Sequence, residues 1–370
     1  MTTPPRIPLL RPSLPALEDY AAQLESVWQT RMLSNFAGQA ARFEELCRSY
    51  GGWEHAAAAA NCDLALTLAI GALELPQGAT VLLPSFTFNS TLHAALWNGL
   101  QPRFVDVDAA TFCLSPDALG EALETHDARL VLATHIFGAA CDVGALEELA
   151  RGAGAALVFD AAHAFATFVD GRHVGTFGDA STFSFSGTKL VTMGEGAVAA
   201  FTDEAVAERF RYLRAYGFRG DYESRYVGLN AKLSELHAAL GTLTVPRAEE
   251  AVAARAALVA RYQERLADVP GVRFQATGAG VRSSCTYLGI DAGTARDALA
   301  VHLDAANIET KPYFRPLHEM ALFGSLPAQP LPVTERLGRS TLCLPLYTDL
   351  PVGDVERVCD EIERFETAQA

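Results

Sequence analysis

The chain has 370 residues and a mass of 39.6 kDa, enough for one large domain and a smaller one, which excludes a small disulfide-stapled fold. Its 29 basic and 44 acidic residues give a net charge of −15 with no basic stripe, which disfavours nucleic-acid binding. Half of the residues are hydrophobic and 20% are charged, a globular rather than a disordered composition.

The N-terminal region predicts neither export nor membrane insertion. Residues 1–15 lack a charged region followed by an apolar core, and the most apolar stretch, Ala56 to Leu75, is interrupted by Asn61 and Asp63. Seven scattered cysteines form no CxxC pair and have no metal-ligand spacing, which indicates reduced thiols. We therefore expect a cytoplasmic protein that binds no metal and no membrane.

Between about residues 80 and 201, short apolar runs alternate with turns and helical patterns, as is typical of an α/β sheet. Several runs are too continuously apolar for a sheet with one wet face, so we expect helices on both faces. The predicted strands are Thr80–Pro84, Arg103–Val107, Arg129–Thr134, Ala156–Asp160, Ala180–Phe185 and Ala197–Phe201.

Beyond residue 201 the pattern becomes mainly helical. The predicted helices are Glu204–Tyr216, Leu233–Leu243 and Arg247–Leu266. The last of these has few breakers and is interpreted as a spacer, so we expect a large α/β domain over residues 1–245 and a smaller α+β domain over residues 246–370. The elements predicted in the smaller domain are a strand and two helices, at Cys285–Ile290, Thr294–Asn307 and Val352–Thr367.

The common phosphate and metal motifs are absent from this sequence. It has no GxxxxGK[ST], no strand followed by GxGxxG and no HExxH, so nucleoside triphosphatases, Rossmann dehydrogenases and metallohydrolases lose support.

The chain contains unusually few lysines compared with arginines. Only three of its 29 basic residues are lysines, namely Lys189, Lys232 and Lys311. A lysine kept under such a bias is suspected of chemistry that arginine cannot do, since it can lose its proton and act as a nucleophile. Lys232 is interpreted as a surface lysine on a helix, and Lys311 as a loop charge or a contact to an anionic ligand. Lys189 follows a strand and is bracketed by apolar residues, so it is either a Schiff-base lysine or a structural one.

A Schiff-base lysine suggests pyridoxal phosphate, which also needs a carboxylate for its ring nitrogen, a flat group against the ring and donors for its phosphate. Asp160 ends an apolar strand, where ligands collect in α/β sheets, although it is alternatively a helix N-cap. Phe86 or Phe88 supplies a stacking ring, unless both belong to the core. Ser184 and the helix start after Asn61 offer a hydroxyl and free N–H groups.

These residues lie in blocks through which the chain resembles the DegT/DnrJ/EryC1/StrS sugar aminotransferases, a branch of the aspartate aminotransferase fold. The blocks run over nearly the whole length: Leu33–Phe36, Leu83–Thr91, Phe104–Asp108, Phe159–Phe165, Phe183–Gly196, Gly228–Gly241, Ile308–His318 and Val333–Tyr347. The resemblance implies a fold type I transferase with a mostly parallel central sheet, helices on both faces and a smaller C-terminal α+β domain.

The resemblance also implies roles at individual positions. Lys189 forms the internal aldimine with pyridoxal phosphate and moves the proton, while Asp160 pairs with the pyridine nitrogen. His163 lies beside the ring hydroxyl, Phe88 stacks on the ring, and Ser184 binds the phosphate.

Further implied roles concern the neighbouring subunit and the substrate. Asn230 reaches the phosphate of the neighbour's cofactor in a homodimer with shared active sites, unless it only caps the next helix. Tyr313 and Phe314 border the substrate, with ordinary packing as the alternative for Tyr313. Where many relatives read Gly-Thr or Ala-Thr, this chain has Cys62 and Asp63, so we expect backbone N–H groups, and not the Asp63 carboxylate, to contact the phosphate.

The resulting hypothesis is an aminotransferase of amino-sugar biosynthesis that moves an amino group from L-glutamate or L-glutamine to a keto-sugar, namely a nucleotide-linked keto-deoxysugar. Arg219, Arg225 and Lys311 are candidates for binding its anionic groups. The alternatives are a keto-cyclitol or other non-nucleotide ring as acceptor, formation of an aromatic amine, and a non-catalytic regulatory protein. Sugar dehydratases of the family are disfavoured, because they carry histidine in place of the Schiff-base lysine.

Overall fold

The centre of the fold is a seven-stranded sheet with the order β1-β9-β8-β5-β4-β2-β3. The structure, a computed structural model, describes residues 5–327 and 329–369. Within this sheet β9 alone runs against the other strands, so the sheet is mostly parallel, as expected. The strands are β1 (His55–Ala59), β2 (Thr80–Pro84), β3 (Gln101–Val105), β4 (Ala128–Thr134), β5 (Ala156–Asp160), β8 (Ala180–Ser184) and β9 (Ala197–Phe201).

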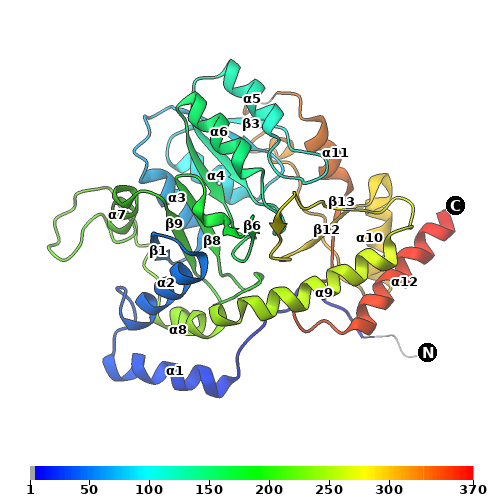
Figure 1. The fold of residues 1–370 in the computed structure, drawn as a ribbon, viewed down its shortest axis with the longest axis horizontal. Coiled ribbons are helices and arrows are strands. Elements are labelled where there is room, and N and C mark those ends of the chain that lie inside the picture. Colours follow the sequence, from blue (N-terminus) through cyan, green and yellow to red (C-terminus); the bar gives the residue numbers. More distant parts are fainter. Residues whose placement is uncertain (1–4, 328, 370) are drawn as a thin grey trace.

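Helices cover both faces of this sheet, which confirms the prediction from its continuous apolar strands (Figure 1). Along β4, Leu130 and Leu132 face one helical layer while Val131 and Ala133 face the other. One layer contains α3 (Cys62–Gly71), α4 (Asn89–Trp97) and α7 (Glu204–Leu213). The other contains α2 (Gly38–Gly51), α5 (Pro116–Thr125), α6 (Val143–Ala153) and α8 (Glu235–Thr244).

A second, three-stranded antiparallel sheet lies in the C-terminal part, with the order β10-β12-β13. Its strands are β10 (Arg273–Phe274), β12 (Leu288–Asp291) and β13 (Thr341–Leu344). The core of this part joins them to α9 (Ala248–Leu266), α10 (Arg296–Ala305) and α12 (Val352–Gln369). Helix α9 runs lengthwise from α8 to this second core (Figure 1), so it has the position expected of a spacer; the division at residue 245 itself stays a prediction.

The remaining elements are short or peripheral. Strands β6, β7 and β11 form a small antiparallel sheet beside the large one. Helix α1 packs on α8, and α11 precedes β13. Their bounds are α1 (Leu17–Thr30), β6 (Phe168–Val169), β7 (Arg172–His173), β11 (Val281–Arg282) and α11 (Pro332–Ser340).

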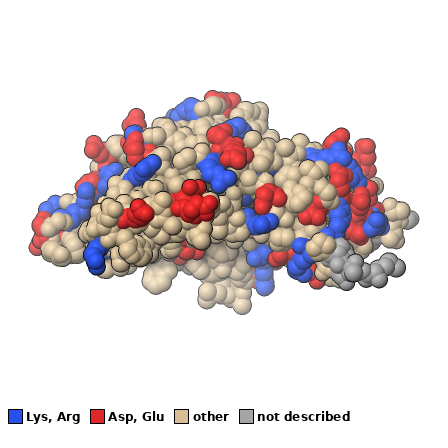
Figure 2. Space-filling view, turned by 90° about the horizontal axis from the view of Figure 1, so that it is seen from below, with Lys and Arg blue, Asp and Glu red and all other residues tan. Residues whose placement is uncertain are grey.

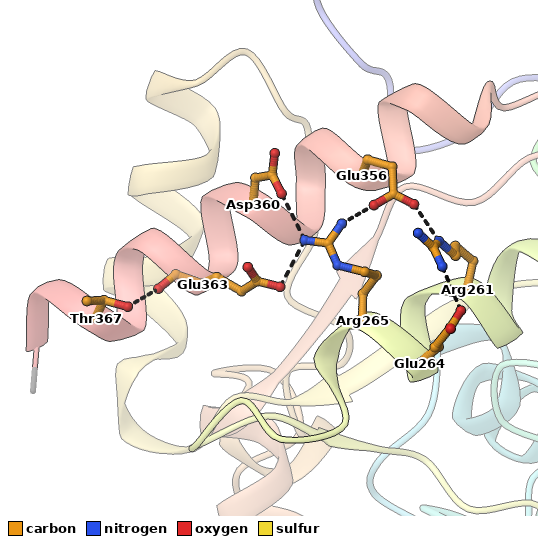
Figure 3. Close-up of polar contacts among 7 residues, drawn as sticks. All are labelled: Arg261, Glu264, Arg265, Glu356, Asp360, Glu363 and Thr367. Carbon is orange, nitrogen blue, oxygen red and sulfur yellow. Dashed lines mark hydrogen bonds and ion pairs between the residues drawn. The ribbon is translucent and has the colours of Figure 1, made fainter.

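An ion-pair cluster joins α9 to α12 (Figure 3). The Arg265 guanidinium pairs with Glu356, with Asp360 at 2.8 Å and with Glu363 at 3.0 Å. One turn earlier, Arg261 also pairs with Glu356. Because one guanidinium contacts three carboxylates of the last helix, Arg265 holds α12 against α9.

We expect Arg265→Met to lower the melting temperature by about 1–3 °C at low salt, since it leaves Asp360 and Glu363 without their cation and Glu356 with Arg261 alone. The difference should shrink in about 1 M salt, where screening is strong. Thermal melts of Arg129→Met, which loses one exposed pair to Asp127, provide the control. If both variants lowered the melting temperature equally and independently of salt, the cluster would add nothing to stability beyond a single exposed ion pair.

The distribution of charged side chains on the surface is consistent with the sequence, which contains no basic stripe. Figure 2 shows acidic and basic side chains interspersed on the face it presents, without a broad basic area. In the part of the chain that the structure describes, no helix combines the length and apolarity needed to cross a membrane.

Candidate active site

A cavity of about 780 Å³ opens at the carboxyl ends of the parallel strands. Thr134 and Asp160 end the neighbouring strands β4 and β5, Ser184 ends β8, and Thr87 lies just after β2. All four line the cavity, together with the first residues of α3. Ligands of open α/β sheets bind at this edge, because the polar groups that follow each strand collect there.

Lys189 lies in the connection between β8 and β9 and lines the cavity. Its Nζ is 5.5 Å from the centroid of the Tyr287 ring. Burial lowers the pKa of Lys189, and the nearby Cys62 and Asp160 only partly oppose this shift. The amine therefore loses its proton more readily than an exposed lysine, as a nucleophile or a base requires.

Asp160 is the last residue of β5 and is 4% exposed. Its Oδ2 accepts a hydrogen bond from Thr91 Oγ1 at 2.7 Å, and its Oδ1 accepts one from the backbone N–H of Ala162 at 3.1 Å. Burial raises the pKa of Asp160, while these two bonds and Lys189 act in the opposite direction. The carboxylate is thus held in one orientation with charge that a cationic group in the cavity can neutralise.

His163 lies three residues after Asp160 and presents a neutral ring. Its Nδ1 accepts a hydrogen bond from the backbone N–H of Phe137 at 3.2 Å, which assigns the ring proton to Nε2. Burial holds the pKa of His163 well below its usual value. Its ring is nearly parallel to that of Phe314, with the centroids 6.1 Å apart. His163 can therefore donate one hydrogen bond within the cavity without carrying charge.

The start of α3 supplies N–H groups at the cavity wall. Asn61 caps this helix by accepting from the N–H of Leu64 at 2.9 Å, and Cys62 and Asp63 follow it along the cavity. Ser184 and Ser186 line the same cavity. Helix N-termini with nearby hydroxyls bind phosphate, although the exposed Asp63 carboxylate opposes an anion there.

The residues present fit pyridoxal phosphate. A buried amine with a lowered pKa and a buried carboxylate share one cavity, where Phe88 is 56% exposed and can cover a flat ring. Cavity-lining positions are occupied by the sequence-predicted residues Cys62, Asp63, Phe88, Asp160, His163, Ser184, Lys189, Lys311, Tyr313 and Phe314.

Phe86, the alternative stacking ring, is fully buried in the core and does not line this cavity. Three further sequence-predicted residues do not line it: Arg219, Arg225 and Asn230. They follow α7 in the segment that stands out from the large sheet at the left of Figure 1. Arg219 pairs with Glu208, and Arg225 pairs with Asp221 at 2.9 Å. Asn230 makes a backbone bridge to Ala215.

The sequence interpretation of Lys232 as a helix residue is wrong, because α8 begins only at Glu235. Lys232 Nζ instead donates to Asn35 Oδ1 at 2.6 Å, in the stretch before the helix, where Ser234 serves as N-cap.

Sequence reasoning missed the threonines that support Asp160. Thr91 Oγ1 lies 2.8 Å from Thr87 Oγ1, which lies 3.0 Å from Thr134 Oγ1, so three hydroxyls form a buried chain behind the carboxylate. The sequence contained a signal for these threonines, because two of them closely follow β2 and the third ends β4, where site residues collect. Tyr287, which comes from the C-terminal part and lines the cavity, had no such signal.

We expect Thr91→Val to weaken pyridoxal phosphate binding about 10- to 100-fold, because a hydrogen bond to a charged group contributes roughly 1.5–3 kcal/mol. Valine matches threonine in shape but cannot donate to Asp160, whose pKa then rises further. Titration of the apoprotein with the cofactor, followed by absorbance, measures the change. Thr91→Ser restores the donor and should restore binding; an unchanged dissociation constant in Thr91→Val would contradict the role.

Comparison with known proteins places the chain among aminotransferases. The model of the DegT/DnrJ/EryC1/StrS aminotransferase family matches residues 16–363. GDP-perosamine synthase of Caulobacter vibrioides is 32% identical, covering 98% of this chain and 99% of the relative. A dTDP-4-amino-4,6-dideoxy-D-glucose transaminase of Shigella dysenteriae is 27% identical over 96% and 98%. The crystal structure of DesI with its TDP-sugar product is 34% identical, with a TM-score of 0.91 over 98% of this chain and 94% of DesI.

Proposed function

Because the chain belongs to the DegT/DnrJ/EryC1/StrS aminotransferase family, we propose that it moves an amino group from L-glutamate or L-glutamine to a nucleotide-linked keto-sugar. Members of this family are pyridoxal-phosphate-dependent aminotransferases, and the similarity to sugar aminotransferases extends over nearly the whole chain. The observation that carries the proposal is the cavity in which Lys189 and Asp160 lie together. A 4-keto-6-deoxy sugar is the acceptor that corresponds chemically to the 4-amino-4,6-dideoxy product named for one relative.

Each cavity residue has a distinct task in this proposal. When bound, pyridoxal phosphate supplies a conjugated ring that takes up the electron pair left on the donor's α-carbon. The amine of Lys189, whose pKa burial lowers, would take the proton from that carbon and return it to the cofactor carbon that is bonded to the donor nitrogen. Asp160 keeps a proton on the ring nitrogen by its negative charge.

The remaining cavity residues hold the cofactor and border the substrate. His163 donates from Nε2 to the ring oxygen, and Phe88 covers the ring face. Ser184 and the N–H groups at Cys62 and Asp63 bind the phosphate. Tyr313 and Phe314 border the substrate and keep water from the reacting carbon.

We include a homodimer in the proposal. Asn230, Arg219 and Arg225 lie on the segment after α7 and do not line the cavity of their own chain. In a homodimer with shared active sites, this segment completes the neighbour's cavity, with Asn230 at the phosphate. Alanine variants of the three residues, mixed in solution with a Lys189 variant, should regain activity through hybrid dimers.

The direct test incubates the cofactor-loaded protein with L-glutamate or L-glutamine and records its absorbance. Loss of the visible band shows that the donor half of the reaction takes place. GDP- and dTDP-linked 4-keto-6-deoxy sugars are then added in turn, and mass spectrometry detects the amino sugar. A keto-cyclitol tests the non-nucleotide alternative; amination of the cyclitol alone would overturn the nucleotide-sugar proposal, and an inert protein would favour a regulatory role.

A further inference from the structure

Few cations line the cavity. Its carboxylates are Asp63, Asp160 and Glu195, whereas its only amines in the described parts of the chain are Lys189 and Lys311, and no arginine joins them. His163 stays neutral because burial depresses its pKa. An anionic substrate therefore enters a site that is already acidic, and it needs a specific cation there. With Lys189 committed to chemistry, Lys311 is the amine that remains among the described residues of this chain that line its own cavity.

Lys311 makes no ion pair with any carboxylate of residues 5–327 and 329–369. Its Nζ lies 4.7 Å from the centroid of the Tyr313 ring, and a hydrogen bond with Tyr313 raises the pKa of Lys311. The amine is therefore charged at neutral pH. Arg219 and Arg225, by contrast, do not line the cavity of their own chain. In the proposed homodimer their segment reaches the neighbour's cavity, but their charges are already paired with Glu208 and Asp221.

The backbone of Lys311 is fixed to the second sheet. Its N–H donates to the carbonyl of Cys343 at 3.2 Å, and the N–H of Cys343 donates back to its carbonyl at 2.8 Å. The side chain is exposed, so it lies at the mouth of the cavity. A stable backbone with a free charged end is what a binding lysine requires.

Two tyrosine rings lie between the two amines. The Tyr313 ring, next to Lys311, contacts the Tyr287 ring with the centroids 5.8 Å apart. The Tyr287 ring is 5.5 Å from Lys189 Nζ. Both amines and both rings line the same cavity, so a ligand held at Lys189 lies in the cavity whose mouth carries Lys311.

We propose that Lys311 binds the side-chain carboxylate of a dicarboxylic amino donor. This rests on the proposed aminotransferase function, which requires the donor's α-carbon at Lys189. The α-carboxylate is bonded to that carbon and stays deep in the cavity, whereas the side-chain carboxylate extends toward the mouth. Lys311 thus selects L-glutamate over L-glutamine, whose neutral amide gains no ion pair.

The test uses two unreactive probes, glutarate and butyrate, which differ by one carboxylate. Calorimetric titration of the cofactor-loaded protein measures their dissociation constants. In Lys311→Met we expect glutarate to bind about 10- to 100-fold more weakly, as for loss of a charge-assisted hydrogen bond, and butyrate to change less than about twofold. Arg315→Met is the matched control, because it removes a positive charge from an exposed position of the same segment outside the cavity.

The outcomes separate clearly. Equal weakening of both probes would assign Lys311 to the α-carboxylate and overturn the proposal, as would unchanged glutarate binding. Weaker binding of a nucleoside diphosphate alone would assign Lys311 to the acceptor instead. Lys311→Arg should keep most of the preference for glutarate, and it serves as the folded variant if Lys311→Met is unstable. If the wild-type protein aminates keto-sugars but Lys311→Met retains glutarate binding, only the role of Lys311 fails.

Discussion

Lys189→Ala should transfer amino groups at least about 10⁴-fold more slowly than the wild-type protein, the largest effect expected of any single substitution. In the proposed function this side chain provides both the nucleophile that holds the cofactor and the base that moves the proton, and removing either function is costly. Single-turnover mixing of the loaded protein with L-glutamate, followed by absorbance, measures the rate. The visible band of the bound cofactor should also shift, because the bond that Lys189 makes with it in the proposed function is lost.

Two controls separate chemistry from folding. Lys189→Arg keeps the positive charge near Asp160 and Cys62 but lacks an amine that loses its proton, so it should be as inactive as Lys189→Ala. The matched substitution Lys232→Ala removes a lysine outside the cavity, and it should keep the absorbance band. Residual activity of Lys189→Arg within about tenfold of wild type would rule out nucleophilic catalysis by Lys189.

The parallel core was predictable because its strands are buried on both faces and therefore apolar without interruption. The observed β2, β5 and β9 match their predicted bounds, and Asp160 lies at the predicted strand end. Once strands are known, the ligand-binding edge follows from their direction. The local sequence pattern was therefore enough to place Lys189, Asp160 and Ser184 at this edge of the sheet, because each lies at or just after a strand that the sequence predicts.

Strand β1 escaped prediction because its sequence is one histidine followed by four alanines. Alanine favours helix, and no alternation marks a strand. In the structure Ala56 and Ala58 face one helical layer while Ala57 and Ala59 face the other. Small side chains let both layers approach the strand closely, so tertiary packing overrides local preference.

The C-terminal contributions to the site depend on contacts between distant segments. Tyr287 and Lys311 reach the cavity only through the second sheet, where β12 pairs with β13 and Lys311 bridges to Cys343. The predicted strand Cys285–Ile290 began three residues too early, because Cys285 has φ 50°, outside the extended region. The hydrophobic periodicity of one segment does not show which distant segment it pairs with in the fold.

Asp160→Asn should reduce transamination about 10²- to 10⁴-fold while the fold survives. Asparagine has the same shape, can accept from the N–H of Ala162 and can donate to Thr91, so the hydrogen bonds are replaced. What disappears is the negative charge that, in the proposed function, keeps the ring nitrogen protonated. Rates of the donor half-reaction for Asp160→Asn and Asp160→Glu measure the effect, and a neutral side chain with wild-type rate would contradict it.

The same variant carries an opposite prediction for stability. Burial raises the pKa of Asp160 in the folded apoprotein above the ordinary value of 3.8, so the stability it contributes is present at low pH and lost as pH rises through the folded pKa. Asparagine has no charge to bury. Apo Asp160→Asn should therefore melt at or above the wild-type temperature at pH 7–8, and this advantage should vanish as pH falls toward 4. A variant that melts lower than wild type at pH 8 would mean that Lys189 and Thr91 more than offset the cost of burying the carboxylate.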